Sequence, residues 1–295
     1  MFTVPESSAA THFFYESGGF RVSLDSFPFH ESEYLAAFRT ECRQGSDLRM
    51  TIRQVPSIAA PEEIAVERTG ETVFQNEAGQ RVRICLNERK DAILYQVTER
   101  SETELLAEIT PKAASQLGSY LILRWLDLPN RFLKRSAVFL HASFIRWKGK
   151  AILFTGIKQI GKSTQAELWR RSRGAEVMNG DRALLRKTDG VWTACGSPFC
   201  GTSGICRNEE VPIAAIVLLK KGPNNRTEPV SLKDATVAFL SGCTFNTMSG
   251  EATEQVMKLA KQIHSEVSML RLTCTPDERA VQCLERQLCK EGDYG

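Results

Sequence analysis

The stretch GIKQIGKSTQAELWRR, residues 156–171, decides how the second half of this chain is built. Its frame, GxxxxGKS, matches the Walker A pattern of phosphate-binding loops. The apolar segment AILFT at 151–155 precedes it and predicts a buried strand, and the residues from the lysine onward predict a helix. Such a loop turns backbone N–H groups toward phosphate oxygens, and the N-terminus of the helix adds partial positive charge. The pattern therefore predicts a nucleoside triphosphate site.

Individual roles within this loop follow from the pattern. Lys162 is expected to reach the β- and γ-phosphates, the hydroxyl of Ser163 to ligate Mg²⁺, and Thr164 to touch the α-phosphate. ATP and Mg²⁺ are the expected ligands. The candidate nucleotide-binding residues are Gly156, Ile157, Lys158, Gln159, Ile160, Gly161, Lys162, Ser163 and Thr164.

The middle of the loop departs from the usual composition. Many such loops carry small residues where this chain has Ile-Lys-Gln. Lys158 adds positive charge beside the polyphosphate. Gln159 stands where glycine often permits a positive φ, and for glutamine that geometry costs about 1–2 kcal/mol. A bound Mg-nucleotide could offset this cost.

The composition is that of a water-soluble globular protein without an obvious polymeric partner. The 295 residues are 42% hydrophobic and 25% charged, with a net charge of +3, which predicts no nucleic-acid partner. The N-terminus shows no secretory signal pattern, and no apolar run approaches the roughly 20 residues that span a bilayer. The nine cysteines suit reduced thiols, with Cys195, Cys200 and Cys206 close together in sequence. We therefore expect a cytoplasmic protein and no membrane partner.

The two halves of the chain differ in their pattern of apolar residues, which predicts domains at 1–130 and 131–295. The first half reads as β-rich, with a hairpin turn at 76–79 and no catalytic cluster, because His12 and His30 lack obvious partners. A helix is predicted from Lys112 to Leu128, ended by Pro129.

The second half alternates apolar strands with helices, which indicates the α/β class. Strands are predicted at 137–145, 151–156, 176–178 and 213–219, and the sequence Thr-Pro-Asp-Glu at 275–278 predicts a capping box that opens a final helix.

An acidic residue follows the helix of the phosphate loop. Asp181 comes directly after the short strand predicted at 176–178, at the edge of the sheet where the loop should open. Phosphoryl transfer needs a group that holds the metal or accepts the proton of the attacking hydroxyl. Because Asn-Gly-Asp is also a good turn sequence, a purely structural role for Asp181 is equally open.

The order of these motifs resembles the HPr kinase/phosphorylase family. HAS at 141–143, the phosphate loop and the sequence NGDR at 179–182 occur in the order that this family shows. The resemblance covers roughly residues 135–290. It implies a P-loop kinase core of the HPr kinase/phosphoenolpyruvate carboxykinase type behind a smaller β-rich domain. It also implies that His141 is the active-site histidine and Asp181 the base on the acceptor serine, with Arg182 beside it.

The chain departs from the family pattern in ways that bear on its substrate. Gly180 replaces the first aspartate of the family's acidic pair, and Thr164 stands where glutamate is usual. The family's E-x-R-G-x-G signature is absent, and a Gly/Ser-rich segment at 196–210 takes its place. We expect this segment to cover the site. Arg207 and Arg182 are candidates for a contact with phosphate or acceptor, and a structural role for Arg207 is equally open. These departures argue against HPr as substrate.

The sequence thus predicts an ATP- and Mg²⁺-dependent kinase that phosphorylates a serine of a peptide or protein, similar to relatives of HPr kinase that modify ribosomally made peptides such as lasso-peptide precursors. The catalytic candidates are Asp181, His141 and Lys162, and the metal candidates are Ser163 and Asp181. Two alternatives stay open: a nucleotide-binding regulatory module with weak or no transfer, and a small-molecule hydroxyl kinase. The acceptor, the choice between ATP and pyrophosphate, and the oligomeric state are also open.

Overall fold

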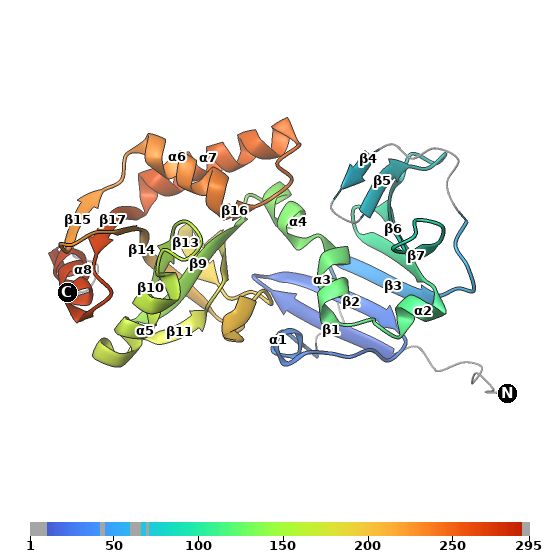
Figure 1. Ribbon diagram of the computed structural model, residues 1–295, viewed down its shortest axis with the longest axis horizontal. Helices are drawn as coiled ribbons and strands as arrows, with labels where there is room; N and C mark the ends of the chain where they lie inside the picture. The colour runs from blue at the N-terminus through green and yellow to red at the C-terminus, as the bar shows by residue number, and fades with distance from the viewer. Residues whose placement is uncertain (1–10, 42–44, 60–65, 69–70, 291–295) are drawn as a thin grey trace. The chain divides into compact units, whose positions relative to one another are not determined.

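The chain divides between Asp127 and Leu128 into two units, each with its own β-sheet (Figure 1). We predicted this boundary after residue 130. The computed structural model describes residues 11–41, 45–59, 66–68 and 71–290. Within those residues, no helix combines the length and apolar character needed to cross a bilayer.

The first unit is built on an eight-stranded sheet in the order β1-β2-β3-β8-β7-β6-β5-β4. The β2–β3 and β3–β8 pairs are parallel and the others antiparallel. The strands are β1 (Thr11–Ser17), β2 (Phe20–Ser26), β3 (Leu48–Gln54), β4 (Val66–Arg68), β5 (Glu71–Gln75), β6 (Arg81–Leu86), β7 (Ile93–Ser101) and β8 (Glu104–Ile109). The predicted hairpin turn at 76–79 is confirmed, because it joins β5 to β6.

The predicted helix from Lys112 to Leu128 is wrong, because three short helices occupy this region. They are α2 (Pro111–Ala114), α3 (Ser119–Leu126) and, in the second unit, α4 (Leu128–Lys134); α1 (Glu33–Ala36) lies earlier. Asp127 adopts a left-handed conformation (φ 49°) that ends α3. Pro129 sits in the first turn of α4, where its missing N–H costs nothing, instead of ending a helix.

The second unit is a mixed α/β structure around a second sheet. Its strand order is β10-β9-β12-β13-β14-β17-β15, with β11 and β16 pairing β9 and an added parallel pairing of β10 with β14. The strands are β9 (Val138–Trp147), β10 (Lys150–Thr155), β11 (Glu176–Asn179), β12 (Arg182–Thr188), β13 (Val191–Cys195), β14 (Glu210–Lys221), β15 (Arg226–Pro229), β16 (Cys243–Thr244) and β17 (Ser268–Cys274). The helices are α5 (Lys162–Arg173), α6 (Leu232–Gly242), α7 (Gly250–Glu266) and α8 (Glu278–Lys290), with a 3₁₀ turn at Gly201–Ser203.

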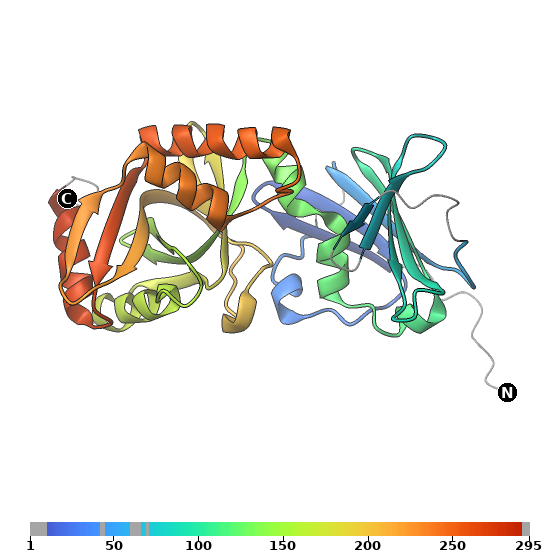
Figure 2. The same ribbon diagram turned by 45° about the horizontal axis from the view of Figure 1, so that its top comes forward.

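Helices cover both faces of this sheet (Figure 2). The strands β10 and β14 supply residues to both of the resulting cores. In β10, Leu153 packs in the core under α6 and α7, whereas Ile152 and Phe154 pack in the core under α5 and α8. A strand buried on both faces reads as a continuous apolar run, as AILF does here.

This burial determines where the phosphate-loop pattern lies. β10 runs parallel to β14 on one side and antiparallel to β9 on the other, so its C-terminal end meets the ends of β14 and β17 at one edge of the sheet. Thr155, the last residue of β10, pairs with Ala142 of β9, beside His141. The loop therefore leaves the sheet between β9 and β14.

The final helix begins later than the capping box predicts. α8 starts at Glu278, and the Asp277 carboxylate accepts a hydrogen bond from the Arg279 N–H (3.0 Å). Thr275 is bound instead by Asn225, whose side-chain oxygen accepts from the Thr275 N–H (3.0 Å). The capping role of Thr275 was therefore predicted wrongly.

Candidate phosphate-loop site

The loop from Gly156 to Ser163 connects β10 to α5 and turns sharply at three positions. Gly156 has φ 142°, Gln159 φ 63° and Gly161 φ 116°. The two glycines adopt such angles readily because they lack a Cβ atom. Gln159 adopts a left-handed geometry, which costs about 1–2 kcal/mol for a residue with a Cβ atom. The chain thus accepts local strain at the centre of the loop.

The loop's side chains divide into exposed and buried ones. Ile157 is 75% exposed, and Lys158, Gln159, Ser163 and Thr164 are also exposed. Ile160 is the exception, since it packs into the core beneath α5. The exposed hydroxyls at the start of α5 are accessible to a ligand.

Lys162 is the buried charge of the site. Its Nζ donates to the backbone oxygens of Gly156 (3.1 Å) and Ile157 (3.3 Å), so the ammonium lies across the loop. Burial lowers its pKa, and the nearby carboxylate of Asp181 partly offsets that effect. An ammonium that is buried against two carbonyl oxygens gains further stabilisation when an anion binds beside it.

A fully buried asparagine shapes the turn that carries Asp181. The Asn179 side-chain oxygen accepts from the N–H groups of Asp181 and Arg182 (2.9 Å each), and its amide donates to the Ser197 oxygen (2.9 Å). Asparagine commonly closes turns in this way. The turn is therefore maintained by Asn179, and the Asp181 carboxylate is left for other contacts.

The carboxylate of Asp181 is instead paired with His141. Nδ1 of His141 lies 2.9 Å from the Asp181 backbone oxygen and 3.2 Å from its Oδ1. Both partners are acceptors, so Nδ1 carries the proton. The Asp181 oxygen also accepts from Ala142 N–H (3.0 Å), and Thr155 donates to the His141 oxygen (3.0 Å), which ties the turn to β9 and β10.

These contacts keep Asp181 ionised. Its pKa lies below the ordinary value, chiefly because His141 donates a hydrogen bond and also because of the charges of Arg182 and Lys162. The side chain is 23% exposed, so a ligand can reach it. The structure thus brings together three of the predicted residues, Lys162, Asp181 and His141, at the edge of the sheet where the loop opens.

The two arginines proposed for phosphate or acceptor have different surroundings. Arg182 lies beside the carboxylate, with Nε 3.7 Å from Asp181 Oδ2 and its guanidinium over the Phe199 ring. Arg207 forms an ion pair with Glu176 (3.0 Å), which Arg146 also binds. Glu176 begins β11, so Arg207 is directed to the end of β11 opposite Asp181.

The segment 196–210 covers the turn that carries Asp181. Gly180 N–H donates to the Ile205 oxygen (3.2 Å), and a Cβ on Gly201 would lie 3.0 Å from Asp181 Oδ1. A Cβ on Gly180 would lie 2.1 Å from Ser203 Oγ, closer than any real contact. The position where the resembled family carries its first aspartate is thus sterically closed by Ser203.

The three clustered cysteines do not form one group. Burial raises the pKa of Cys195 to about 12, with the Glu210 charge adding to it. Burial, and then the neighbouring Cys200, raise the pKa of Cys206 to about 11. In the residues that the structure describes, no three His, Cys, Asp or Glu side chains gather as metal ligands.

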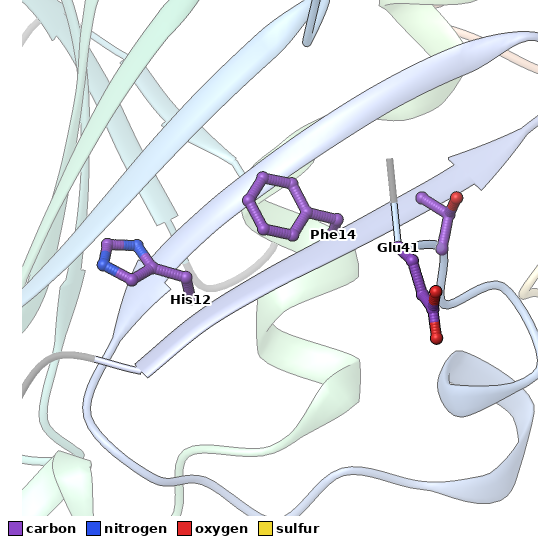
Figure 3. Close-up of a pocket in the computed structure, with 4 residues that line it drawn as sticks. His12, Phe14 and Glu41 are labelled. Atoms are coloured by element: carbon purple, nitrogen blue, oxygen red, sulfur yellow. The ribbon is translucent and has the colours of Figure 1, made fainter. Parts of the chain in front are cut away.

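A cavity of about 670 Å³ lies in the first unit. His12 and Glu41 lie at opposite ends of it, with Phe14 between them (Figure 3). The His12 ring is bound to Asp25 (2.5 Å). His12, Phe14 and Glu41 form no acid–base pair with one another, so we assign no chemistry to this cavity.

Sequence reasoning missed the residues that position Asp181. Asn179 and Ser197 form the turn, and Ser203 closes Gly180, yet only Asn179 had a local signal, as an asparagine preceding Gly-Asp. Ser197 and Ser203 belong to a segment whose contacts cannot be read from neighbouring residues.

Comparison with known proteins finds a distant likeness to solved structures. No protein-family profile and no curated protein matches the chain. Among solved structures, the HPr(Ser) kinase/phosphatase from Coxiella burnetii is similar at 15% sequence identity and a TM-score of 0.29, over 52% of this chain and 93% of that chain. A likeness this weak carries no functional conclusion, so we base the proposal below on the geometry of the site.

The lowered pKa of Asp181 predicts a pH dependence of stability. Because the folded state binds this proton less readily than the unfolded state, the ionised carboxylate stabilises the fold above its ordinary pKa of 3.8. That contribution is lost as the pH falls through the lowered value. The difference in free energy of unfolding between wild type and Asp181→Asn should therefore shrink on going from neutral pH to below 3.8, as urea titrations would measure. A difference independent of pH would contradict the His141–Asp181 pairing.

The closure of Gly180 by Ser203 predicts coupled substitutions. Gly180→Ala should lower the free energy of unfolding by about 1–3 kcal/mol, because the new Cβ overlaps Ser203. The same change should cost at least about 1 kcal/mol less in a Ser203→Gly background, since only the Cys200 oxygen would then be near. Gly250→Ala, with open space around it, is the matched control. Additive effects in the double-mutant cycle would show that Ser203 does not fill this position.

Proposed function

We propose that the protein is a Mg²⁺- and ATP-dependent kinase that phosphorylates a hydroxyl group, with a serine of a peptide or protein as the acceptor. The observation that carries the proposal is the convergence at one sheet edge of Lys162 and an ionised Asp181 held by His141. Phosphoryl transfer needs a cation that neutralises the phosphates and a carboxylate that accepts the proton of the acceptor hydroxyl. The choice of a peptide or protein as the acceptor rests on the sequence resemblance.

In the proposed step, the acceptor oxygen forms a bond to the γ-phosphorus while the bond from that phosphorus to the β–γ bridging oxygen breaks. ADP leaves, and the acceptor proton passes to the Asp181 carboxylate. Lys162 Nζ donates to phosphate oxygens in place of the loop carbonyls, and the loop's backbone N–H groups donate to the remaining phosphate oxygens. His141 acts as a positioning residue, since its Nδ1–H fixes the orientation of the carboxylate.

The residues present fit a magnesium ion. Mg²⁺ binds through one or two carboxylates together with substrate phosphates and waters, so the exposed Ser163 hydroxyl and the Asp181 carboxylate are an adequate protein contribution. When bound, the ion would neutralise charge on the β- and γ-phosphates.

One observation favours a second candidate, a nucleotide-binding regulatory module with little or no transfer. Ser203 fills the space beside Gly180, so a second carboxylate cannot be accommodated there, and Gly201 packs against Asp181. A segment that covered the carboxylate permanently would block an acceptor. The small-molecule hydroxyl kinase uses the same core and differs only in acceptor.

The test is transfer to a panel of acceptors by wild type and Asp181→Asn. With Mg-ATP and serine-containing peptides, we expect intact mass spectrometry to show the gain of one phosphoryl group. Asp181→Asn should reduce the rate by about 100-fold or more while nucleotide affinity stays close to that of the wild type. Asp189→Asn is the matched control, because Asp189 lies in an exposed turn between β12 and β13.

The outcomes separate the candidates. Phosphorylated small molecules without phosphorylated peptides would favour the metabolite kinase. Tight ATP binding with no product on any acceptor would favour the regulatory module. Transfer that survives Asp181→Asn would remove Asp181 from the role of base.

A further inference from the structure

A second cavity lies against the phosphate loop, with a volume of about 420 Å³. The loop and the first turn of α5 form one side of it, through Gln159, Thr164 and Gln165, and the ends of β14 and β17 form the other. This volume falls within the roughly 300–1,000 Å³ of small-molecule sites and exceeds what a phosphate group needs.

The topology of the sheet places this cavity on the opposite flank of the loop from Asp181. β10 has β9 on one side and β14 on the other. Asp181 is bonded to Ala142 of β9, whereas the cavity is lined by Leu219 of β14 and Cys274 of β17. A nucleoside triphosphate is an extended molecule with its γ-phosphate at one end. If the γ-phosphate faces Asp181, the nucleoside leaves the loop on the flank of β14.

The walls have the chemistry of a nucleoside site. Ile160, Leu219 and Pro276 supply apolar surface on which a base can pack. Gln165 is 2% exposed; its amide nitrogen donates to Cys274 Sγ (3.4 Å), while its buried Oε1 accepts no hydrogen bond from the described part of the chain. An unpaired buried acceptor is costly, and a ligand that donates to it removes the cost.

We propose that this cavity receives the base and ribose of the phosphoryl donor, with Gln165 Oε1 accepting a hydrogen bond from a base amino group or a ribose hydroxyl. The inference rests on the proposed function and makes it more specific, since it selects a nucleoside triphosphate over pyrophosphate as the donor. Thr275, held by Asn225, closes the cavity at the start of the segment leading to α8.

The test compares the binding of Mg-ATP with that of Mg-tripolyphosphate, which offers the phosphates without the nucleoside. In calorimetric titrations, wild type should bind ATP more tightly than tripolyphosphate. Gln165→Leu, nearly the same in shape, should weaken ATP by about tenfold and leave tripolyphosphate unchanged. Gln262→Leu, on an exposed position of α7, is the matched control and should change neither.

A photolabel gives a second readout that depends on no variant. A base-azido analogue of ATP should label peptides containing residues 159–165, 219–222 or 274–276, and excess ATP should abolish the labelling. Labelling confined to other peptides would overturn the inference. So would equal affinity of wild type for ATP and tripolyphosphate, or equal weakening of both by Gln165→Leu.

Failure of this inference can be told from failure of the proposed function. Preferential ATP binding that depends on Gln165, without product on any acceptor, would support the cavity assignment and count against the kinase. Phosphoryl transfer with equal use of ATP and tripolyphosphate would support the kinase and overturn the cavity assignment. If wild type binds neither ligand, both the proposed function and the cavity assignment are wrong.

Discussion

The burial of β10 on both faces is the constraint on which the rest of the site depends. Because its side chains pack into one core under α6 and α7 and another under α5 and α8, the strand has a single register, and Gly156 emerges at a fixed point of the sheet edge. The antiparallel neighbour β9 then places His141 level with the start of the loop, and the parallel neighbours β14 and β17 end on its other flank. The turn with Asp181 and the cavity beside Leu219 therefore lie on opposite sides of one loop.

Around that fixed point, each charged group of the site has hydrogen-bond partners that a ligand can replace or extend. Lys162 lies against two loop carbonyls, and Asp181 accepts the proton of His141 while its turn is secured by Asn179. The Asn179 side chain accepts the hydrogen bonds from the backbone N–H groups that shape the Asn-Gly-Asp turn. The Asp181 carboxylate is therefore not needed to hold the turn and stays available for a ligand. The segment 196–210 packs so closely on this turn that neither Gly180 of the turn nor Gly201 of the segment has space for a side chain.

The phosphate loop and its flanking strand and helix could be predicted from the sequence because every requirement is local: an apolar run, two glycines, then Lys-Ser. The turn at 76–79 and the strands β9, β10, β11 and β14 of the second unit could be predicted because their patterns are also local. The helix from Lys112 to Leu128 was mispredicted because the left-handed Asp127 interrupts a pattern that is apolar at helical spacing throughout. The contacts of Ser203 with Gly180, and a cavity built from Gln165, Leu219 and Cys274, join segments far apart in sequence, so no local pattern could reveal them.

The proposed function depends above all on binding of nucleotide phosphates by the strained loop through Lys162. The most direct measurement is calorimetric titration of Mg-ATP into wild type and Lys162→Ala, with Lys158→Ala as a matched control on the exposed side of the same loop. The wild type should bind saturably at one site. Loss of the buried ammonium should weaken binding by about tenfold to a hundredfold, while loss of Lys158 has a smaller effect. Equal affinity of wild type and Lys162→Ala, with both folded, would contradict the assignment of this loop as a phosphate site.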